Sequence, residues 1–443
     1  MYKNTFNIRM GRVALGVFAA MFAASASAEE ASEPTGLLGY MGADVNETEF
    51  MKNLGLKFGG WVNAGITYNA NDPDDRFNGP VTFNDRASEF QMNQLYLYLQ
   101  RAVSTEGGWD FGGRVDFMYG TDSVFTQAYG SPRGHWDLNL VNGGKRFYDI
   151  ALPQAYFEVF APFGNGITAK IGHFYTIIGN EVVTAPDNFF YSHAYTMQYG
   201  EPFTHTGVLL SYPINDNFTL TGGGVTGSET GGWDGAWDKG LGNWAFLGGV
   251  SWVSDDKGTS ATLNATSGEI SEQDANNWSM YSLVIKHDIM EGLHYTFQHD
   301  HGWAGSVVGA ADRSGSGGRD AEWYGINQYL TYDIADDLAV GVRGEWFRDD
   351  DGYRVLARSR VAAWEARGGG TGGLAAYNAG GTNYYAVTVG LNWKPLNWLA
   401  VRPNVRYDWA DYNDDNGDVF DGSSAGGKKD DQFLFSTDVV VAF

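Results

Sequence analysis

Twelve residues at the C-terminal end decide the fold: 432-QFLFSTDVVVAF-443. Side chains of a β-strand point alternately to its two faces, so this stretch has one apolar face and one mixed face. The apolar face carries Phe433, Phe435, Thr437, Val439, Val441 and Phe443. Such a face on a terminal strand is typical of a strand that meets lipid. Taken alone, the stretch also fits an edge or core strand of a soluble sandwich.

The N-terminal residues indicate export. Three basic residues lie within 1–12, an apolar run follows over 13–24, and Ala26-Ser27-Ala28 forms a small-residue cleavage site. This pattern predicts a signal peptide over 1–28, with Glu29 as the first mature residue. The apolar run is too short to span a bilayer as a helix, and no later run is long enough. A membrane-embedded chain of this kind must be a closed barrel, because only helices and closed sheets satisfy their backbone groups in lipid.

The composition agrees with a barrel and excludes several classes of function. The chain has 443 residues with 61 Gly, 25 Tyr, 27 Phe and 15 Trp, and it has no Cys. The absence of Cys excludes a disulfide framework and thiolate metal sites. Without the signal peptide, 53 acidic residues stand against 26 basic ones (29 minus 3), which gives a net charge of about −27. A chain this acidic is not expected to bind nucleic acid.

Alternation with a period of two recurs along the chain from Leu56 onward. Residues 29–55 lack it and are interpreted as a periplasmic N-terminal lead-in. The clearest strand, 108–119, places Val115 on an apolar face and Arg114 on the opposite, charged face. The predicted strands are 56–69, 89–101, 108–119, 149–160, 166–174, 205–213, 217–226, 243–253, 258–267, 278–288, 292–301, 322–333, 338–347, 383–394, 398–409 and 432–443.

The connections between these strands alternate in length. Short ones such as 102–107 and 213–216 alternate with long ones such as 175–204 and 268–277. Short turns at one rim and long loops at the other are typical of bacterial outer-membrane barrels. We therefore predict an all-β fold over 56–443: a transmembrane antiparallel β-barrel of about 16 strands in the cell outer membrane, with short periplasmic turns and long extracellular loops.

The final strand is expected to close the barrel by pairing with 398–409 on one side and with 56–69 on the other. Its end resembles the C-terminal sorting signal of bacterial outer-membrane barrels, a last strand that ends in Phe. The resemblance implies an assembly signal formed by Phe443, Val441 and Val439, which the barrel assembly machinery would read at the periplasmic rim.

A second resemblance rests on the run G-x-E-x-x-x-x-P-x-N-x-F-x-S-x-x-Y. The matching residues are Gly179, Glu181, Pro186, Asn188, Phe190, Ser192 and Tyr195. Together with QMNQLY at 91–96 and PFTHTG at 202–207, this run resembles the OmpL-like outer-membrane beta-barrel porin family. The resemblance covers most of the chain after the signal peptide. It implies a porin fold in the outer membrane, and it implies neither a particular solute nor particular binding residues.

The third long connection, 175–204, is the candidate pore constriction. In sixteen-stranded porins the third loop folds into the lumen, and the many aromatic residues of 175–204 need a place to pack. Its acidic residues would then face basic wall residues and create a transverse field. The constriction candidates are Glu181, Asp187 and Glu201 on the loop, with Arg114, Arg402, Arg406, Glu158 and Lys170 on the wall. Asp438, inward on the last strand, would lie near Arg402 or Arg406. Alternatively, the loop acids cap turns and pair locally.

Catalytic and metal-binding patterns are weak. Alternation places His294 and Asp300 inward and His299 and His301 outward, so these four cannot share one metal. Loop 411–421 is rich in Asp and Asn but lacks the spacing of a calcium loop. Loose binding of divalent cations there stays an alternative. We expect no enzymatic activity, no cofactor and no metal site.

These patterns favour a porin, a water-filled pore for passive diffusion of small hydrophilic solutes. The alternative is a barrel with a blocked lumen that acts as a surface structural or interaction protein. The expected partners are outer-membrane lipids, the barrel assembly machinery, small hydrophilic solutes and, by analogy with porins of this size, further copies of the chain in a homotrimer. No nucleic acid is expected.

Overall fold

The computed structural model describes most of the chain as one closed sheet. The described residues are 36–128, 136–137, 140, 147–227, 243–270, 273–308, 317–355, 381–412, 420 and 429–443. The predicted signal peptide over 1–28 lies outside them.

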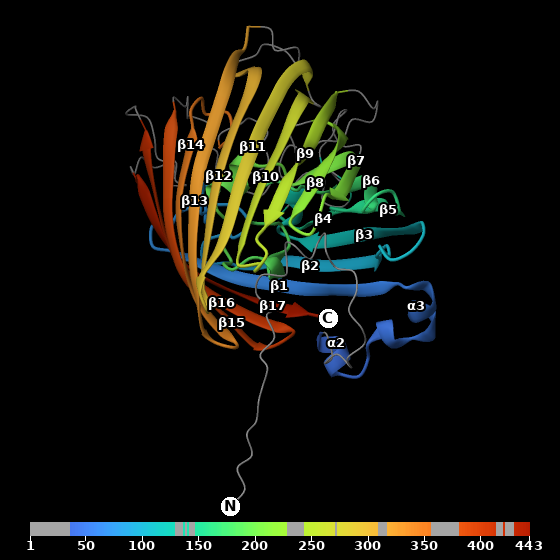
Figure 1. Ribbon diagram of the computed structural model, residues 1–443. Coiled ribbons are helices and arrows are strands. Elements are labelled where there is room, and N and C mark those ends of the chain that lie inside the picture. The colour runs from blue at the N-terminus through green and yellow to red at the C-terminus, as the bar shows by residue number, and fades with distance from the viewer. Residues whose placement is uncertain are drawn as a thin grey trace, which may run out of the picture.

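The sheet is an antiparallel barrel (Figure 1). β1 pairs with both β2 and β17, so the strand order closes on itself. Because β4 and β5 both pair with β3, they are two parts of one strand, and the 17 segments make the predicted 16 strands. The segments are β1 (Lys57–Asn69), β2 (Phe90–Arg101), β3 (Asp110–Gly120), β4 (Asp149–Ala151), β5 (Ala155–Ala161), β6 (Ile167–Tyr175), β7 (Thr204–Pro213), β8 (Phe218–Thr226), β9 (Trp244–Val253), β10 (Thr259–Ile270), β11 (Gln273–Met290), β12 (Leu293–Val308), β13 (Arg319–Ala335), β14 (Leu338–Asp349), β15 (Thr382–Leu396), β16 (Leu399–Tyr412) and β17 (Asp431–Ala442).

The C-terminal strand closes the barrel as predicted. β17 pairs with β16 on one side, where Phe435 lies opposite Val405, and with β1 on the other, where Phe435 lies opposite Tyr68. Directly opposed side chains in an antiparallel pair contact each other on the same face of the sheet. The three apolar residues therefore form a continuous strip across the closing strands on the outer surface.

Side-chain exposure confirms the two faces of the last strand. Phe433 is 45% exposed and Phe435 is 51% exposed. The alternate residues Leu434 and Ser436 are 0% and 1% exposed. The exposed face is the apolar one. In the outer membrane this face meets the lipid hydrocarbon, and the buried face meets the barrel interior.

One predicted strand is interrupted. The sequence predicts a single strand over 149–160, but β4 ends at Ala151 and β5 begins at Ala155. Pro153 lies in the gap, and proline has no N–H to donate to the ladder. Side chains alternate between the two faces both before and after the gap, so the sequence pattern does not reveal the break.

One predicted long loop is wrong. Residues 268–277 were expected to form a loop, but β10 runs to Ile270 and β11 begins at Gln273. The strands are longer here than elsewhere, since β11 has 18 residues and β3 has 11. Residues 268–277 are mostly polar, so they carry none of the apolar alternation by which the other strands were predicted.

Short helices lie outside the sheet. The lead-in contains α2 (Leu37–Tyr40), η1 (Val45–Glu47) and α3 (Glu49–Leu54), and the connections contain α4 (Ser123–Thr126), η2 (Ala185–Asp187) and η3 (Thr196–Gly200). Thr48 caps α3 by accepting a hydrogen bond from Met51 N at 3.5 Å, and Gly55 ends it with φ +61°. Among the described residues, no helix has the length and apolar character needed to cross a membrane.

A charge on the outer surface tests the orientation of the last strand. Phe435→Arg should lower the free energy of unfolding in lipid vesicles by about 2–4 kcal/mol, because a guanidinium would enter the hydrocarbon. The matched control is Phe218→Arg, at the short-turn rim, where the loss should be about 0–1 kcal/mol. Equal losses at both positions in urea titrations would contradict this orientation.

Candidate functional site

The β6–β7 connection (residues 176–203) is held by inward-facing side chains of strands on opposite sides of the barrel. Gln94 of β2 donates a hydrogen bond to the carbonyl oxygen of Val183 at 2.7 Å, and Asn264 of β10 donates one to that of Ile177. The wall residues that hydrogen-bond to the connection include Asn93, Gln94, Asn264, Gln298, Trp323, Asn327, Tyr329, Arg343, Glu345, Asn392, Arg402, Arg406 and Asp408.

Local contacts give the connection its shape. The side-chain amide of Asn188 donates to the carbonyl oxygens of Val182 at 2.7 Å and Thr184 at 3.0 Å, and it accepts a hydrogen bond from Val182 N at 3.0 Å. These three bonds close the turn that contains η2. The aromatic residues of the connection are packed inside the protein; those less than 9% exposed are Phe190, Tyr191, Tyr195, Tyr199 and Phe203.

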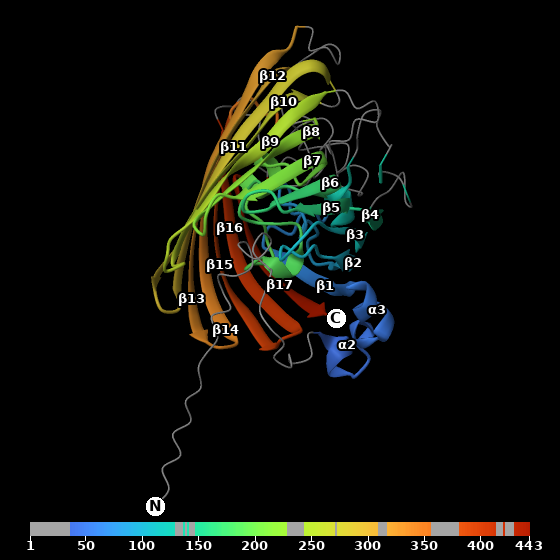
Figure 2. The same cartoon turned by 45° about the vertical axis from the view of Figure 1, so that its right-hand side comes forward.

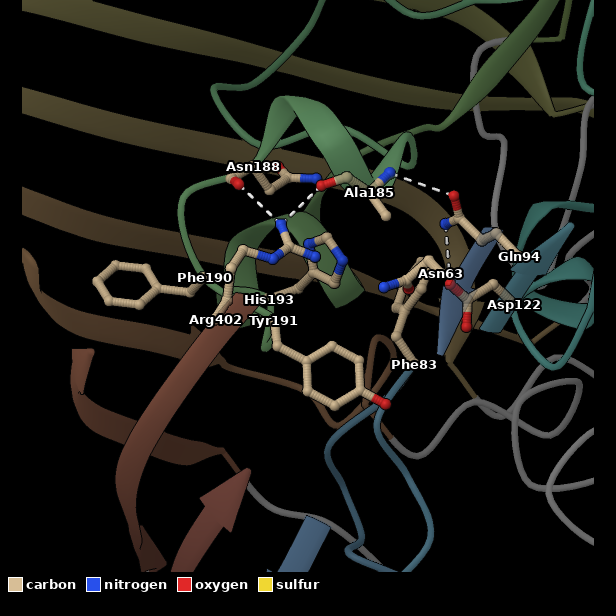
Figure 3. Close-up of a pocket in the computed structure, with 10 residues that line it drawn as sticks. All are labelled: Asn63, Phe83, Gln94, Asp122, Ala185, Asn188, Phe190, Tyr191, His193 and Arg402. Atoms are coloured by element: carbon tan, nitrogen blue, oxygen red, sulfur yellow. Dashed lines mark hydrogen bonds between the residues drawn. The ribbon is translucent and has the colours of Figure 1, made fainter. Parts of the chain in front are cut away.

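Arg402 of β16 binds the connection through its backbone. Its Nη1 donates to the carbonyl oxygens of Ala185 at 2.6 Å and Asn188 at 2.8 Å, as Figure 3 shows. Its Nε donates to Asp438 of β17 at 3.0 Å, so the predicted ion pair between these two residues is present. A planar guanidinium can bind a carboxylate and two carbonyl groups at once, which a lysine cannot do with the same geometry.

A second group of charges forms a chain from the connection into the wall. Arg343 of β14 lies 2.7 Å from Glu181 of the connection and 2.7 Å from Glu345. Arg406 of β16 lies 2.8 Å from Glu345 and 2.7 Å from Asp408. All five side chains are buried. Buried charges are tolerated only when they are paired and hydrogen-bonded, as these are.

The same charges also bind the backbone and ring of Tyr195. Tyr195 N donates to Glu345 at 2.8 Å, and its hydroxyl donates to Asp408 at 2.8 Å. Burial alone would raise the pKa of Glu181, but the Arg343 guanidinium and His193 lower this pKa to about 2. Glu181 is therefore a permanent anion at neutral pH, matched to Arg343.

The loop acids were expected to face basic wall residues, with Arg114, Arg402 and Arg406 as candidates. Burial raises the pKa of Asp187, and the charges of Arg114 and Arg402 act against this rise, so both arginines lie near that carboxyl group. Glu181 pairs with Arg343, which lies on the inner face of a predicted strand but was not among the candidates. Asp187 accepts a hydrogen bond from Thr184 at 2.6 Å. Arg402 and Arg406 bind wall carboxylates and loop carbonyl oxygens, because backbone oxygens inside a protein also need donors.

The other candidate wall residues lie on β3, β5 and β6. Arg114 lies 2.7 Å from Asp116 of its own strand and 4.4 Å from the ring centroid of Tyr98. Glu158 and Lys170 are opposite each other in the β5–β6 pair, both on the inner face. Arg114 also acts on the connection, since its charge opposes the rise that burial causes in the pKa of Asp187.

The β1–β2 connection (residues 70–89) also packs against the β6–β7 connection, which was not predicted. Thr82 donates hydrogen bonds from its N and Oγ1 to Gln198 at 2.6 and 2.7 Å, and Tyr199 donates to the carbonyl oxygen of Pro80. Phe77 and Phe83 of this connection are buried. The apolar residues of 70–89 are the signal that could have indicated this, since a solvated loop rarely carries them.

A cavity of about 10 Å³ lies between the two connections and the wall, among Arg402, Gln94, Tyr191 and Phe83 (Figure 3). This is near the smallest volume that holds one water molecule. The inner faces of β1, β2, β14, β16 and β17 are closely packed, since Asn63, Gln94, Arg343, Arg406 and Asp438 are each at most 1% exposed.

The opposite side of the barrel carries small polar residues toward the short-turn rim, together with Val284 and Lys286 on the inner face of β11. Toward the short-turn rim, inner-face residues of β8, β9, β10 and β12 are half-buried rather than buried; they are Thr219, Ser251, Ser260, Thr262 and Thr296. By contrast, Arg406 and Asp438 on the inner faces of β16 and β17 are each 1% exposed. Solvent therefore reaches the interior at the short-turn end of β8–β12, whereas higher on the same wall Asn264, Ser282 and Gln298 are buried.

A buried pair of carboxyl groups holds the end of the β6–β7 connection. Gln298 Nε2 of β12 donates to Glu201 at 2.5 Å and to Asp300 at 2.9 Å. Burial raises the pKa of Glu201 well above its ordinary value, and the neighbouring Asp300 carboxyl raises it further. Alternation alone placed Asp300 on the inner face but could not reveal this partner.

Metal ligands are not grouped in the part of the chain that the structure describes. Within the described ranges, no three His, Asp or Glu side chains lie close enough together to hold a metal ion. His294 hydrogen-bonds to Asp288 at 2.6 Å and to Asp333 at 3.3 Å. Most of the 411–421 loop, for which loose cation binding was an alternative, lies outside the described residues.

A closed antiparallel barrel of 16 strands with an apolar exterior and a charged, polar interior defines an outer-membrane protein of the porin class. Within this class, residues 55–443 match the family described as "Putative beta-barrel porin-2, OmpL-like", and the chain belongs to that family. No curated protein sequence matches the chain significantly.

Solved porin structures share the fold at low sequence identity. A structure described as the high-pH form of Pseudomonas putida OprB has a TM-score of 0.54 and 12% identity, covering 93% of this chain and 99% of that one. An anion-selective porin from Comamonas acidovorans has a TM-score of 0.52 and 11% identity over 88% and 99% of the two chains. Vibrio cholerae OmpT has a TM-score of 0.52 and 10% identity over 88% and 97%. At these identities the likeness shows the fold alone.

Removing one buried arginine tests the charge chain. Arg343→Ala leaves Glu181 and Glu345 without their shared cation, so the free energy of unfolding should fall by about 3–5 kcal/mol. The control is Arg348→Ala on the same strand, whose partner Asp350 is exposed, and it should cost less than about 1 kcal/mol. Urea unfolding in vesicles measures both losses. A small loss for Arg343→Ala would show that this charge chain is not buried inside the folded barrel.

Substitution of Glu201 tests the carboxyl pair through pH. Because the pKa of Glu201 is raised in the folded protein, its stabilising contribution is present below its ordinary pKa of 4.5 and is lost as pH rises above it. Glu201→Gln mimics the protonated acid and should reduce this loss. Glu181 has the opposite pH dependence: its stabilising contribution is present above pH 4.5 and is lost as the pH falls toward 2. Glu181→Gln should therefore lower the stability at neutral pH. If Glu201→Gln lost as much stability as the wild type when the pH rises above 4.5, the proposed pair of Glu201 and Asp300 would be contradicted.

Proposed function

We propose that this protein is a narrow outer-membrane pore for passive diffusion of small hydrophilic solutes, not an enzyme. The observation that carries the proposal is the half-buried lining of Ser and Thr hydroxyl groups along β8–β12. Hydroxyl groups can replace the hydration shell of a polar solute without binding it tightly, which passage through a pore requires. In this proposal the β6–β7 connection is the constriction, and the half-buried inner faces of β8–β12 line the path below it, toward the short-turn rim.

The packed side of the barrel supports a fixed constriction. Arg343, Arg402 and Arg406 each bind both a wall carboxylate and a carbonyl oxygen of the connection. Such pairs lock the connection against one wall, so the pore size is set by what remains on the other. Because the charges compensate one another, the expected selection is by size and polarity more than by charge.

A barrel with a blocked lumen is the second candidate, and the small cavity beside Arg402 favours it. In that case the barrel would serve as a surface structural or interaction protein. A homotrimer is proposed for either function, and the OmpT structure described as a trimer form, with a TM-score of 0.52, is consistent with it.

Conductance separates the two functions. Purified protein in a planar bilayer should give stepwise currents, and Thr262→Trp should reduce the step by at least about twofold, because the indole would fill the path. The control is Leu263→Trp, on the outer face of the same strand, which should leave the step unchanged. Absence of steps at every voltage would favour the blocked barrel, and equal effects of both substitutions would contradict the path along β10.

A further inference from the structure

The lead-in contacts the barrel at the one place where the closing pair of strands is incomplete. Gly60 of β1 and Phe443 exchange two backbone hydrogen bonds, Gly60 N to Phe443 O at 3.0 Å and Phe443 N to Gly60 O at 2.9 Å. β1 continues past this position to Lys57. Hydrogen-bonded positions recur every second residue in an antiparallel pair, so Phe58 points its N–H and C=O to the β17 side of the ladder, beyond Phe443.

The side chain of Asn46 pairs with Phe58 in place of a strand residue. Its Nδ2 donates to the carbonyl oxygen of Phe58 at 2.9 Å, and its Oδ1 accepts from Phe58 N at 2.7 Å. These two bonds reproduce the backbone pattern of the next hydrogen-bonded position of the ladder, two residues beyond the one that Phe443 occupies. Asn46 is itself positioned by Asp44, whose side chain accepts from Asn46 N at 2.8 Å and caps η1. Unpaired strand edges are templates for pairing with another strand, and Asn46 removes this one.

The lead-in also covers the C-terminal residue. A Cβ on Gly36 would lie 2.9 Å from Phe443 Cα, so the two backbones are in close contact. The Tyr40 ring lies 6.0 Å from that of Trp398, whose carbonyl oxygen accepts a hydrogen bond from Ala442 N at 2.8 Å. The lead-in thus crosses the end of β17, from β1 to the β15–β16 turn. Figures 1 and 2 both show α2 beside the C-terminus.

We propose that residues 36–55 form a seam clasp, which covers the Phe58 edge and Phe443 once the barrel has closed and so withholds both from the barrel assembly machinery. A partner that recognises a terminal strand must pair with its edge or contact its last side chain. Both features are occupied by the seam clasp. Binding of that partner and folding of the seam clasp are therefore mutually exclusive, and folding of the clasp favours release of the finished barrel. This holds whether the lumen is open or blocked.

Asn46→Ala in the full-length protein tests the seam clasp. In detergent micelles, hydrogen exchange at the Phe58 amide should become about tenfold faster, because its acceptor is lost. Release of Phe443 by a carboxypeptidase should also accelerate several-fold. The matched control is Asn53→Ala, an exposed asparagine of α3, which should leave both rates unchanged. Heat-dependent gel mobility verifies that each variant is a folded barrel.

A second variant separates the two contacts of the seam clasp. Gly36→Val places a side chain against the Phe443 backbone without touching Asn46, so it should accelerate release of Phe443. The proposal is overturned if Asn46→Ala and Gly36→Val both release Phe443 at the wild-type rate. It is also overturned if Asn53→Ala accelerates release as much as Asn46→Ala, because the effect would then be general loosening of the lead-in.

Discussion

The pairing of backbone groups in lipid is the constraint on which the whole structure depends. A strand in a bilayer has no water to satisfy its N–H and C=O groups, so the sheet must close. Closure makes the last strand a neighbour of the first, and Phe435 of β17 then lies between Val405 and Tyr68. Closure also leaves backbone groups of β1 unpaired where β1 extends past β17. There the side-chain amide of Asn46 completes the ladder.

Closure in turn creates an interior, and the residues that fill this interior are not determined by the pairing of the strands. Sixteen strands enclose more space than their own side chains occupy. Here two connections fill one side, and arginines hold them there. A guanidinium has five donors, so Arg402 can bind Asp438 together with two carbonyl oxygens of the β6–β7 connection. The lining of small hydroxyl side chains on β8–β12 is the complement of this packing, since no arginine reaches across from that side within the described residues.

The sequence was sufficient for the barrel and insufficient for the interior. Period-two alternation marks a membrane strand because lipid imposes one apolar face, and short turns mark one rim; together they predicted sixteen strands and the closing pairs. Where lipid imposes nothing, as at 268–277, the signal vanished and a strand was taken for a loop. Alternation correctly placed the side chains of Arg402, Arg406 and Arg343 on the inner face of the barrel. It does not specify how far along the barrel axis each side chain lies or which partner it binds. Those depend on how a connection of 28 residues, 176–203, folds across the barrel, which no local pattern encodes.

The pairing of loop to wall through carbonyl oxygens has a consequence for how such a pore can evolve. A constriction held by acid–arginine pairs between loop and wall would change its charge whenever one partner changed. The Glu181–Arg343 pair is of this kind, but Arg402 binds backbone oxygens of residues 185 and 188, and these remain whatever side chains stand there. The loop can therefore change side chains that face the solvent path while the arginine continues to fix its position. In the proposed pore, loop side chains would then set the selectivity, while the wall arginines set where the loop lies.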